Sequence, residues 1–132
     1  MKYLFDASSI LEAITKDKIE VLSVNYTVEL ARYELGNTIW KRIRLLGKVN
    51  REEYTRLISL VKRVLKLMET LSIECHETQI AEVAAKLNIT FYDAAYVFHA
   101  KQKNIPLVTE DKELKTKTAA FIKTKSLKEI PS

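Results

Sequence analysis

Glycine, proline and cysteine are scarce in this chain of 132 residues, and each scarcity excludes a class of structure. With two glycines and two prolines, the chain has neither a flexible linker nor a glycine-rich loop for phosphates. One cysteine, Cys75, allows no internal disulfide, and with only two histidines it does not readily complete a closed zinc site. Because Cys75 follows Ile73 in a stretch typical of a strand, we expect its thiol to be buried and unreactive.

Long apolar runs are also missing. The longest, Ala94–Phe98, is far shorter than the roughly 20 residues of a membrane-spanning helix. Asp6 comes too early for the apolar core of a signal peptide, so we expect a cytoplasmic protein with no membrane partner. A chain of this length buries about two thirds of its unfolded surface, which favours one domain over residues 1–132.

Basic residues exceed acidic ones, 22 to 17, which gives a net charge of +5. They are concentrated in three segments, residues 41–51, 62–66 and 112–128. For any one segment, a solvated surface is the simpler interpretation. A surface that binds phosphates is the alternative, and an acidic metal pocket nearby would favour it.

Strand-like and helix-like segments alternate along the chain. Apolar residues recur with a helical period from Tyr54 to Met68, which predicts a helix capped by Asn50. Gly47 is expected to end the helix before it, and the tail from Glu129 to be loosely held. We expect strands at residues 2–5, 25–28, 71–75, 106–109 and 120–124, and helices at 8–14, 16–23, 31–46, 50–68, 80–87, 90–98 and 112–118. This α/β alternation predicts a central parallel β-sheet of four to five strands, flanked by helices on both faces.

Four short segments place an acid where a strand ends or a helix begins: Asp6, Glu34, Asp93 and Asp111. In an open parallel sheet, ligands bind beyond the carboxyl ends of the strands, where Asp6 and Asp111 are expected. Glu34 shares its helix face with Asn37, a polar pair that suits a cleft better than a core. Carboxylates brought close together repel unless they are protonated or neutralised by a cation, and oxygen ligands select Mg²⁺ or Mn²⁺.

Each acid also has a purely structural explanation. Asp6 fits the N-cap of the helix that follows it, and Asp111 fits a first-turn acid of a helix capped by Thr109. Asp93 lies three residues after Thr90, which is the spacing of a capping box. Glu34 near the start of a long helix is compatible with a solvated charge. Spacing alone does not show that the four acids converge.

Taken together, the four segments resemble the motifs of PIN-domain proteins, most closely the small VapC-type toxins of toxin–antitoxin pairs. The resemblance spans nearly the whole chain, and its third motif is the most specific. In chain order the motifs are Phe5-Asp6-Ala7-Ser8, Glu34-Leu35-Gly36-Asn37, Tyr92-Asp93-Ala94-Ala95-Tyr96 and Val108-Thr109-Glu110-Asp111.

This resemblance implies a PIN-like fold and a Mg²⁺- or Mn²⁺-dependent endoribonuclease, whose catalytic residues and metal ligands are Asp6, Glu34, Asp93 and Asp111. It also implies a homodimer and a cognate antitoxin that blocks the site. Around the acids we expect supporting hydrogen bonds from Ser8, Asn37 and Thr109. Phosphates of the RNA are expected to meet Arg44, Lys112 and Lys115, while the role of Glu110 stays open.

The two longest predicted helices, which carry Trp40 and the stripe from Tyr54 to Met68, offer more apolar surface than one sheet face can cover. We expect part of this surface to be buried in a homodimer or under an antitoxin, with Trp40 as the anchor. Simple core packing is the alternative for any one of these residues.

Three other functions fit parts of the pattern. A catalytically silent PIN-like module would bind metal tightly without cleaving RNA. A DNA-directed nuclease would share the acid chemistry and differ in its response to the 2′-OH. A phosphoacceptor receiver domain has a similar outline but carries paired acids after its first strand, whereas Asp6 is followed by Ala7 and Ser8.

Overall fold

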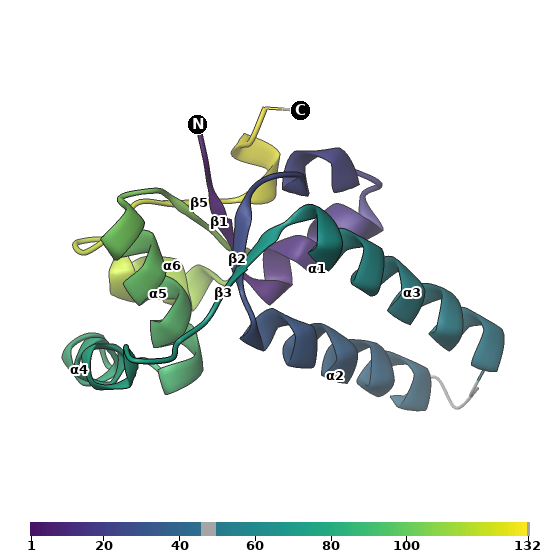
Figure 1. Cartoon of the computed structure of the whole chain (residues 1–132), viewed down its shortest axis with the longest axis horizontal. Coiled ribbons are helices and arrows are strands. Elements are labelled where there is room, and N and C mark those ends of the chain that lie inside the picture. The colour runs from purple at the N-terminus through teal and green to yellow at the C-terminus, as the bar shows by residue number, and fades with distance from the viewer. Residues whose placement is uncertain (46–49, 132) are drawn as a thin grey trace.

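A five-stranded parallel sheet forms the centre of the computed structural model, which describes residues 1–45 and 50–131 (Figure 1). The strands are β1 (Leu4–Phe5), β2 (Tyr26–Val28), β3 (Glu69–Leu71), β4 (Leu107–Val108) and β5 (Thr124–Lys125). Their order across the sheet is β3-β2-β1-β4-β5, and every neighbouring pair runs parallel. The expectation of a parallel α/β fold is therefore confirmed.

Helices cover both faces of this sheet (Figure 1). On one side lie α1 (Ala7–Thr15), α2 (Leu30–Leu45) and α3 (Arg51–Leu67), and on the other α4 (Glu77–Leu87), α5 (Phe91–Lys103) and α6 (Lys112–Thr118). Two short 3₁₀ turns, η1 (Ile19–Leu22) and η2 (Leu127–Glu129), complete the fold. Helices α2 and α3 pack against each other as a hairpin that extends away from the sheet (Figure 1).

The central strands are short, but their side chains are fully buried. Leu4 and Phe5 of β1 and Leu107 and Val108 of β4 have no exposed surface, as expected for parallel strands covered on both faces. Burying each such side chain stabilises the fold by roughly 1.5–3 kcal/mol. The sheet is thus held by packing, and the chain at the ends of these strands is free to carry polar groups.

The order of the strands creates a switch point beside β1. From β1 the chain passes to β2 and β3 on one side, and it then returns to β4 on the other side. The loops after β1 and β4 therefore diverge, and the crevice between them is where ligands bind in open parallel sheets. Asp6 follows β1 and the segment Thr109–Asp111 follows β4.

Two strands differ from the sequence prediction. The strand expected at residues 71–75 lies at Glu69–Leu71, because its partner β2 ends at Val28, which is paired with Leu71. Cys75 instead lies in an exposed turn with a φ of 70°, so the expectation of a buried thiol is wrong. The strand expected at residues 120–124 is reduced to Thr124–Lys125, where it pairs with β4.

The C-terminal tail also differs from the prediction of a loosely held segment. Leu127 and Ile130 are buried in the core, 3 % and 9 % exposed. Ser126 and Glu129 form a capping box around η2, in which the Glu129 carboxylate accepts a hydrogen bond from the Ser126 amide at 2.9 Å. Two apolar side chains three residues apart therefore anchor this end of the chain.

Other expectations concern helix ends and membranes. Asn50 caps α3 as predicted, with its side chain accepting from the amides of Glu52 and Glu53. Gly47, expected to end α2, lies outside the described residues. Across residues 1–45 and 50–131, no helix combines the length and the apolar content needed to cross a membrane.

Candidate functional site

Asp6 lies between the last residue of β1, Phe5, and the first residue of α1, Ala7. Its Oδ1 accepts hydrogen bonds from the Ser9 amide at 2.9 Å and from the Ser8 hydroxyl at 2.7 Å. The carboxylate is only 7 % exposed, and this burial raises its pKa, against hydrogen bonds from Thr109, Ser8 and Ser9 that lower it. Asp6 is therefore the N-cap of α1, as its structural explanation predicted, and also a buried acid at the switch point.

Asp111 holds the corresponding place after β4. Its Oδ1 accepts from the Leu114 amide at 3.1 Å, so Asp111 rather than Thr109 is the N-cap of α6. Thr109 lies inside the sheet edge with no exposed surface, and its hydroxyl accepts from the Asp111 amide at 3.1 Å. The predicted cap at Thr109 is wrong because α6 begins at Lys112, which makes Asp111 the residue directly before the helix.

Ser8 connects the two loops. Its hydroxyl lies 3.3 Å from that of Thr109 and accepts from the Glu110 amide at 3.0 Å, while it donates to Asp6. The predicted supporting positions of Ser8 and Thr109 thus form one hydrogen-bonded chain between β1 and β4. The Glu110 side chain turns elsewhere, since its Oε2 accepts from the Leu127 amide at 2.8 Å.

Glu34 is held by a residue that the sequence analysis did not assign. The hydroxyl of Tyr96 on α5 donates to Glu34 Oε1 at 2.6 Å, and Tyr96 is only 2 % exposed. Burial and the nearby Glu34 carboxylate raise the pKa of Tyr96, so it stays a neutral donor. Asn37, predicted to support Glu34, is exposed and makes no hydrogen bond to it within residues 1–45 and 50–131.

The only signal for Tyr96 in the sequence was its place in the third motif, three residues after Asp93. Residues three apart lie on one face of a helix, so Asp93 and Tyr96 face the same cleft. The partner of Tyr96 is 62 positions away in the chain, and no local pattern names it.

Asp93 lies in the first turn of α5. The Thr90 hydroxyl accepts from the Asp93 amide at 3.0 Å, so this cap uses the backbone of Asp93 rather than its carboxylate. Its pKa is raised by burial, then by the negative charges of Asp111 and Asp6, while Thr90 and Lys117 lower it. Thr90 therefore caps α5 through the Asp93 amide, while the Asp93 carboxylate lies among other acids.

The four predicted acids lie close enough to affect one another. Burial raises the pKa of Glu34, the hydrogen bond from Tyr96 lowers it, and the charges of Asp6 and Asp93 raise it further. Asp93 responds to Asp6 and Asp111 in the same way. Two strand ends and two helix starts thus bring these carboxylates to one edge of the sheet, where negative charge is in excess.

The chemistry of this donor set fits a hard divalent cation. All the donors are oxygens, and the ionised forms of Glu34 and Asp93, which neighbouring carboxylates disfavour, are stabilised by an added positive charge. Within residues 1–45 and 50–131, no three Asp, Glu, His or Cys side chains form a preassembled group that could hold a metal ion. Mg²⁺ is commonly bound by one or two carboxylates and several waters, a mode that this arrangement suits.

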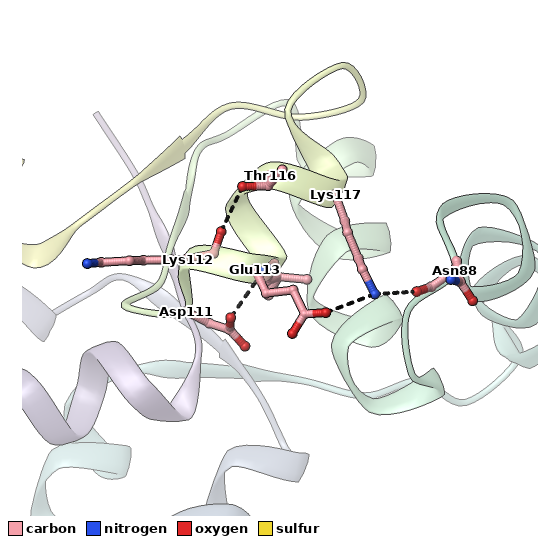
Figure 2. A network of polar contacts seen from close by, with 7 residues as sticks. Asn88, Asp111, Lys112, Glu113, Thr116 and Lys117 are labelled. Atoms are coloured by element: carbon pink, nitrogen blue, oxygen red, sulfur yellow. Dashed lines mark hydrogen bonds and ion pairs between the residues drawn. The ribbon is translucent and has the colours of Figure 1, made fainter.

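A polar cavity of about 380 Å³ opens beside Asp93 and Asp111. Lys117 spans its rim, with its ammonium 3.2 Å from Glu113 Oε1 and 3.1 Å from the backbone oxygen of Asn88 (Figure 2). The Asp111 side chain, which caps α6, lies on the same side of that helix as Glu113 and Lys117 (Figure 2). The cavity thus offers both carboxylates and a cation.

The three predicted phosphate-binding residues lie at different distances from these acids. Lys112 is exposed at the start of α6, next to Asp111, but its side chain extends away from Lys117 (Figure 2). The Lys115 ammonium donates to the Ser126 hydroxyl. Arg44 lies near the end of α2, 5.7 Å above the ring of Trp40, about three helical turns from Glu34.

Comparison with known proteins places this geometry in a family. The profile of the PIN domain matches residues 3–119, which includes all four acids. The chain is 30 % identical to "Exonuclease VapC9" of Pyrobaculum aerophilum, over 96 % of this chain and 93 % of the relative. It is 27 % identical to "Ribonuclease VapC3" of the same organism, over 92 % of this chain and 98 % of the relative.

Solved structures agree with the fold. The crystal structure of PAE2754 from Pyrobaculum aerophilum has a TM-score of 0.78 and 30 % identity, covering 97 % of this chain and 92 % of that one. The structure of VapBC2 from Rickettsia felis, bound to a DNA fragment from their promoter, has a TM-score of 0.66 and 18 % identity, covering 96 % and 98 %. With a profile match over most of its length and full-length VapC relatives, this chain belongs to the PIN-domain family.

Proposed function

We propose that this protein is a Mg²⁺- or Mn²⁺-dependent endoribonuclease, the toxin of a toxin–antitoxin pair, which hydrolyses RNA phosphodiester bonds at Asp6, Glu34, Asp93 and Asp111. One observation carries the proposal: at the switch point of the sheet, the charges of Asp6 and Asp93 raise the pKa of Glu34, and those of Asp111 and Asp6 raise the pKa of Asp93. The names of the VapC relatives, one a ribonuclease and one an exonuclease, support nuclease chemistry.

Each residue has a role in this mechanism. Asp6 and Asp93 would hold the cation, and Glu34 and Asp111 would assist directly or through water. When bound, the ion supplies Lewis-acid stabilisation of the phosphate and activation of water. Ser8 and Thr109 keep the two strand ends in register, and Tyr96 fixes the orientation of Glu34. No histidine is needed, and His99 is buried with its Nε2 3.1 Å from the backbone oxygen of Ser72.

Two partners accompany this function. An antitoxin is proposed because the VapBC structures share this fold, and RNA as a target fits the cytoplasmic location expected from the sequence. A homodimer is proposed because Trp40 and Leu67 of the α2–α3 hairpin are 47 % and 46 % exposed. Large apolar side chains left in water on one hairpin are typical of an interface.

The substrate and the mode of cutting are tested together. Linear single-stranded RNA, a circular RNA of the same sequence and the matching DNA are incubated with the purified protein and Mg²⁺ or Mn²⁺, with EDTA as the control. We expect both RNAs to be cut and DNA to be spared. A circle that survives would indicate an exonuclease, and cleaved DNA would indicate a DNA-directed enzyme. Cutting in EDTA would exclude the metal.

A further inference from the structure

Three large aromatic side chains are left in solvent beside the acidic site. Tyr33 is 75 % exposed, Tyr92 61 % and Phe91 38 %. All three line one groove of about 290 Å³, close to the lower limit of roughly 300 Å³ for small-molecule pockets. Its remaining lining is mainly apolar and includes Val28 and Ala95. Exposed apolar side chains that gather around a groove, rather than scatter singly, are typical of a binding site.

The groove adjoins the acids through the chain itself. Tyr33 directly precedes Glu34 on α2, and Phe91 and Tyr92 directly precede Asp93 on α5. Val28 ends β2, so the groove opens at the same carboxyl edge of the sheet as Asp6. It is separate from the polar cavity beside Asp111, with which it shares no lining residue.

We propose that this groove, formed by Tyr33, Phe91 and Tyr92, is a stacking site for a nucleobase of the RNA strand, next to the phosphate at the four acids. The inference rests on the proposed function. We expect a strand whose phosphate lies at Glu34 and Asp93 to bring a neighbouring base to the rings that precede these acids in the same helical turns.

Charge also favours a base over a phosphate in this groove. The acid on its rim, Glu29, is paired with Arg32, whose hydrogen bond of 2.7 Å lowers the pKa of that carboxyl. The rim is therefore balanced in charge, and among the described residues no Lys or Arg lines the groove to bind a phosphate. Aromatic faces stack on any base, so the site gives affinity with little sequence preference.

Substitutions at Tyr33 and Tyr92 separate stacking from simple apolar contact. Each is changed to Phe, Leu and Ala in an Asp6→Asn background that prevents cleavage, and the affinity for a labelled single-stranded RNA is measured by fluorescence anisotropy. We expect Phe to preserve affinity, Leu to weaken it, and Ala to weaken it by about 5-fold to 150-fold per ring. Both residues are exposed, so circular dichroism should show an unchanged fold.

The dependence on salt supplies a control. Stacking releases no counterions, so the aromatic variants should lower affinity at every salt concentration and leave the log–log slope unchanged. Lys112→Ala, if Lys112 meets a phosphate, should instead make the slope shallower by about 0.7. An aromatic variant whose slope changes as that of Lys112→Ala does would contradict stacking.

A fluorescent base gives a second readout. RNA with 2-aminopurine scanned through successive positions should be quenched at one or two positions by the parent protein and recover fluorescence with the Tyr33→Ala, Tyr92→Ala double variant. If affinity and fluorescence are the same with and without the two rings, the proposal is overturned. It is also overturned if the variants lose only the antitoxin, because the groove would then be a protein-docking surface.

The experiments distinguish a failure of the stacking site from a failure of the nuclease activity. A wild-type protein that cleaves RNA, with aromatic variants that bind RNA equally well, removes the stacking site and leaves the nuclease. A wild-type protein that neither binds nor cleaves RNA removes both.

Discussion

At the scale of single residues, two of the acids both cap a helix and belong to the acidic site. Asp6 and Asp111 are N-caps, and their carboxylates therefore satisfy amides at the starts of α1 and α6. Burial disfavours the ionised form of Asp6, and the charges of Asp6 and Asp111 disfavour the ionised form of Asp93. Functional sites commonly hold such unfavourable charge, and removing it should change the stability of the protein.

Asp93→Asn should stabilise the metal-free protein at neutral pH. In the fold the pKa of Asp93 lies above its ordinary value of 3.8, mainly through burial, so folding favours the protonated form. This contribution to stability is complete below the ordinary pKa and is lost as pH rises through the folded pKa. Urea unfolding in EDTA at several pH values should show wild type falling further than Asp93→Asn as pH rises from about 4 to 7.

The comparison between these two proteins cancels the titrations that Asp93 does not influence, whereas the pKa of Glu34, which the Asp93 charge raises, contributes to the expected difference. Burial lowers the pKa of His99, which therefore costs stability as pH falls, but it does so equally in both proteins. Parallel curves for wild type and Asp93→Asn would mean that Asp93 is an ordinary solvated acid.

Ser8→Ala should shift the acid limb of the activity profile to higher pH. The Ser8 hydroxyl donates to Asp6 at 2.7 Å and stabilises its ionised form, so its loss raises the pKa of Asp6 further. Cleavage should also fall by about 10- to 100-fold, the usual cost of removing a partner of a metal-binding group. A suitable control is Ser59→Ala on the exposed face of α3. A rate loss without a shift in the profile would leave Ser8 a merely structural role.

At the scale of elements, the caps explain why acids stand where they do. Asp111 is followed by α6, a helix of 7 residues that needs its N-cap. Asp111→Ala should lower the free energy of unfolding by about 1 kcal/mol, whereas Asp111→Asn should preserve it, because Asn is an equally good cap. Both should impair cleavage if the charge is needed.

Thr90→Ala is the matched control for this cap. Thr90 caps α5 without a charge, because its hydroxyl accepts from the Asp93 amide. Thr90→Ala should therefore also lower the free energy of unfolding by about 1 kcal/mol. Urea denaturation measures all three variants. An Asp111→Asn protein as unstable as Asp111→Ala would show that the carboxylate, not the cap, stabilises α6.

Helices were more predictable from the sequence than strands. The stripe from Tyr54 to Met68 and its cap at Asn50 are local patterns, and α3 lies where they predict it. Strands of two or three residues depend on their neighbours: β3 ends at Leu71 because β2 ends at Val28. The anchored C-terminal tail was not predicted either, because the burial of Ile130 depends on packing against the rest of the fold.

In the candidate site, too, local features were predicted from the sequence and contacts between distant segments were not. Asp6, Glu34, Asp93 and Asp111 were predicted from acids at strand ends and helix starts and from the resemblance of the four segments to PIN-domain motifs. The bond from Tyr96 to Glu34 and the groove of Tyr33 and Tyr92 were missed, because each joins segments far apart in the chain. Asn37 was assigned to Glu34 from helix spacing, and Tyr96 from another helix holds Glu34 instead.

At the scale of the whole molecule, the α2–α3 hairpin presents exposed apolar side chains that a partner can cover. Trp40, 47 % exposed, lies on it with the Arg44 guanidinium above its ring. Trp40→Ala should weaken a homodimer by about 30-fold or more, as for an aromatic hot spot of about 2 kcal/mol. Light scattering across micromolar concentrations measures this change, and Lys41→Ala on the same helix is the control. A wild-type monomer throughout that range would remove the homodimer.

The most direct test of the central claim is the rate of RNA cleavage by wild type, Asp93→Asn and Glu113→Gln, each with Mn²⁺ or Mg²⁺ and with EDTA. Glu113 is the matched control, an exposed acid beside the same cavity but outside the four. We predict cleavage by wild type and Glu113→Gln only with the metal, and a loss of more than about 100-fold in Asp93→Asn. Cleavage by Asp93→Asn at the wild-type rate, or cleavage in EDTA, would contradict the account.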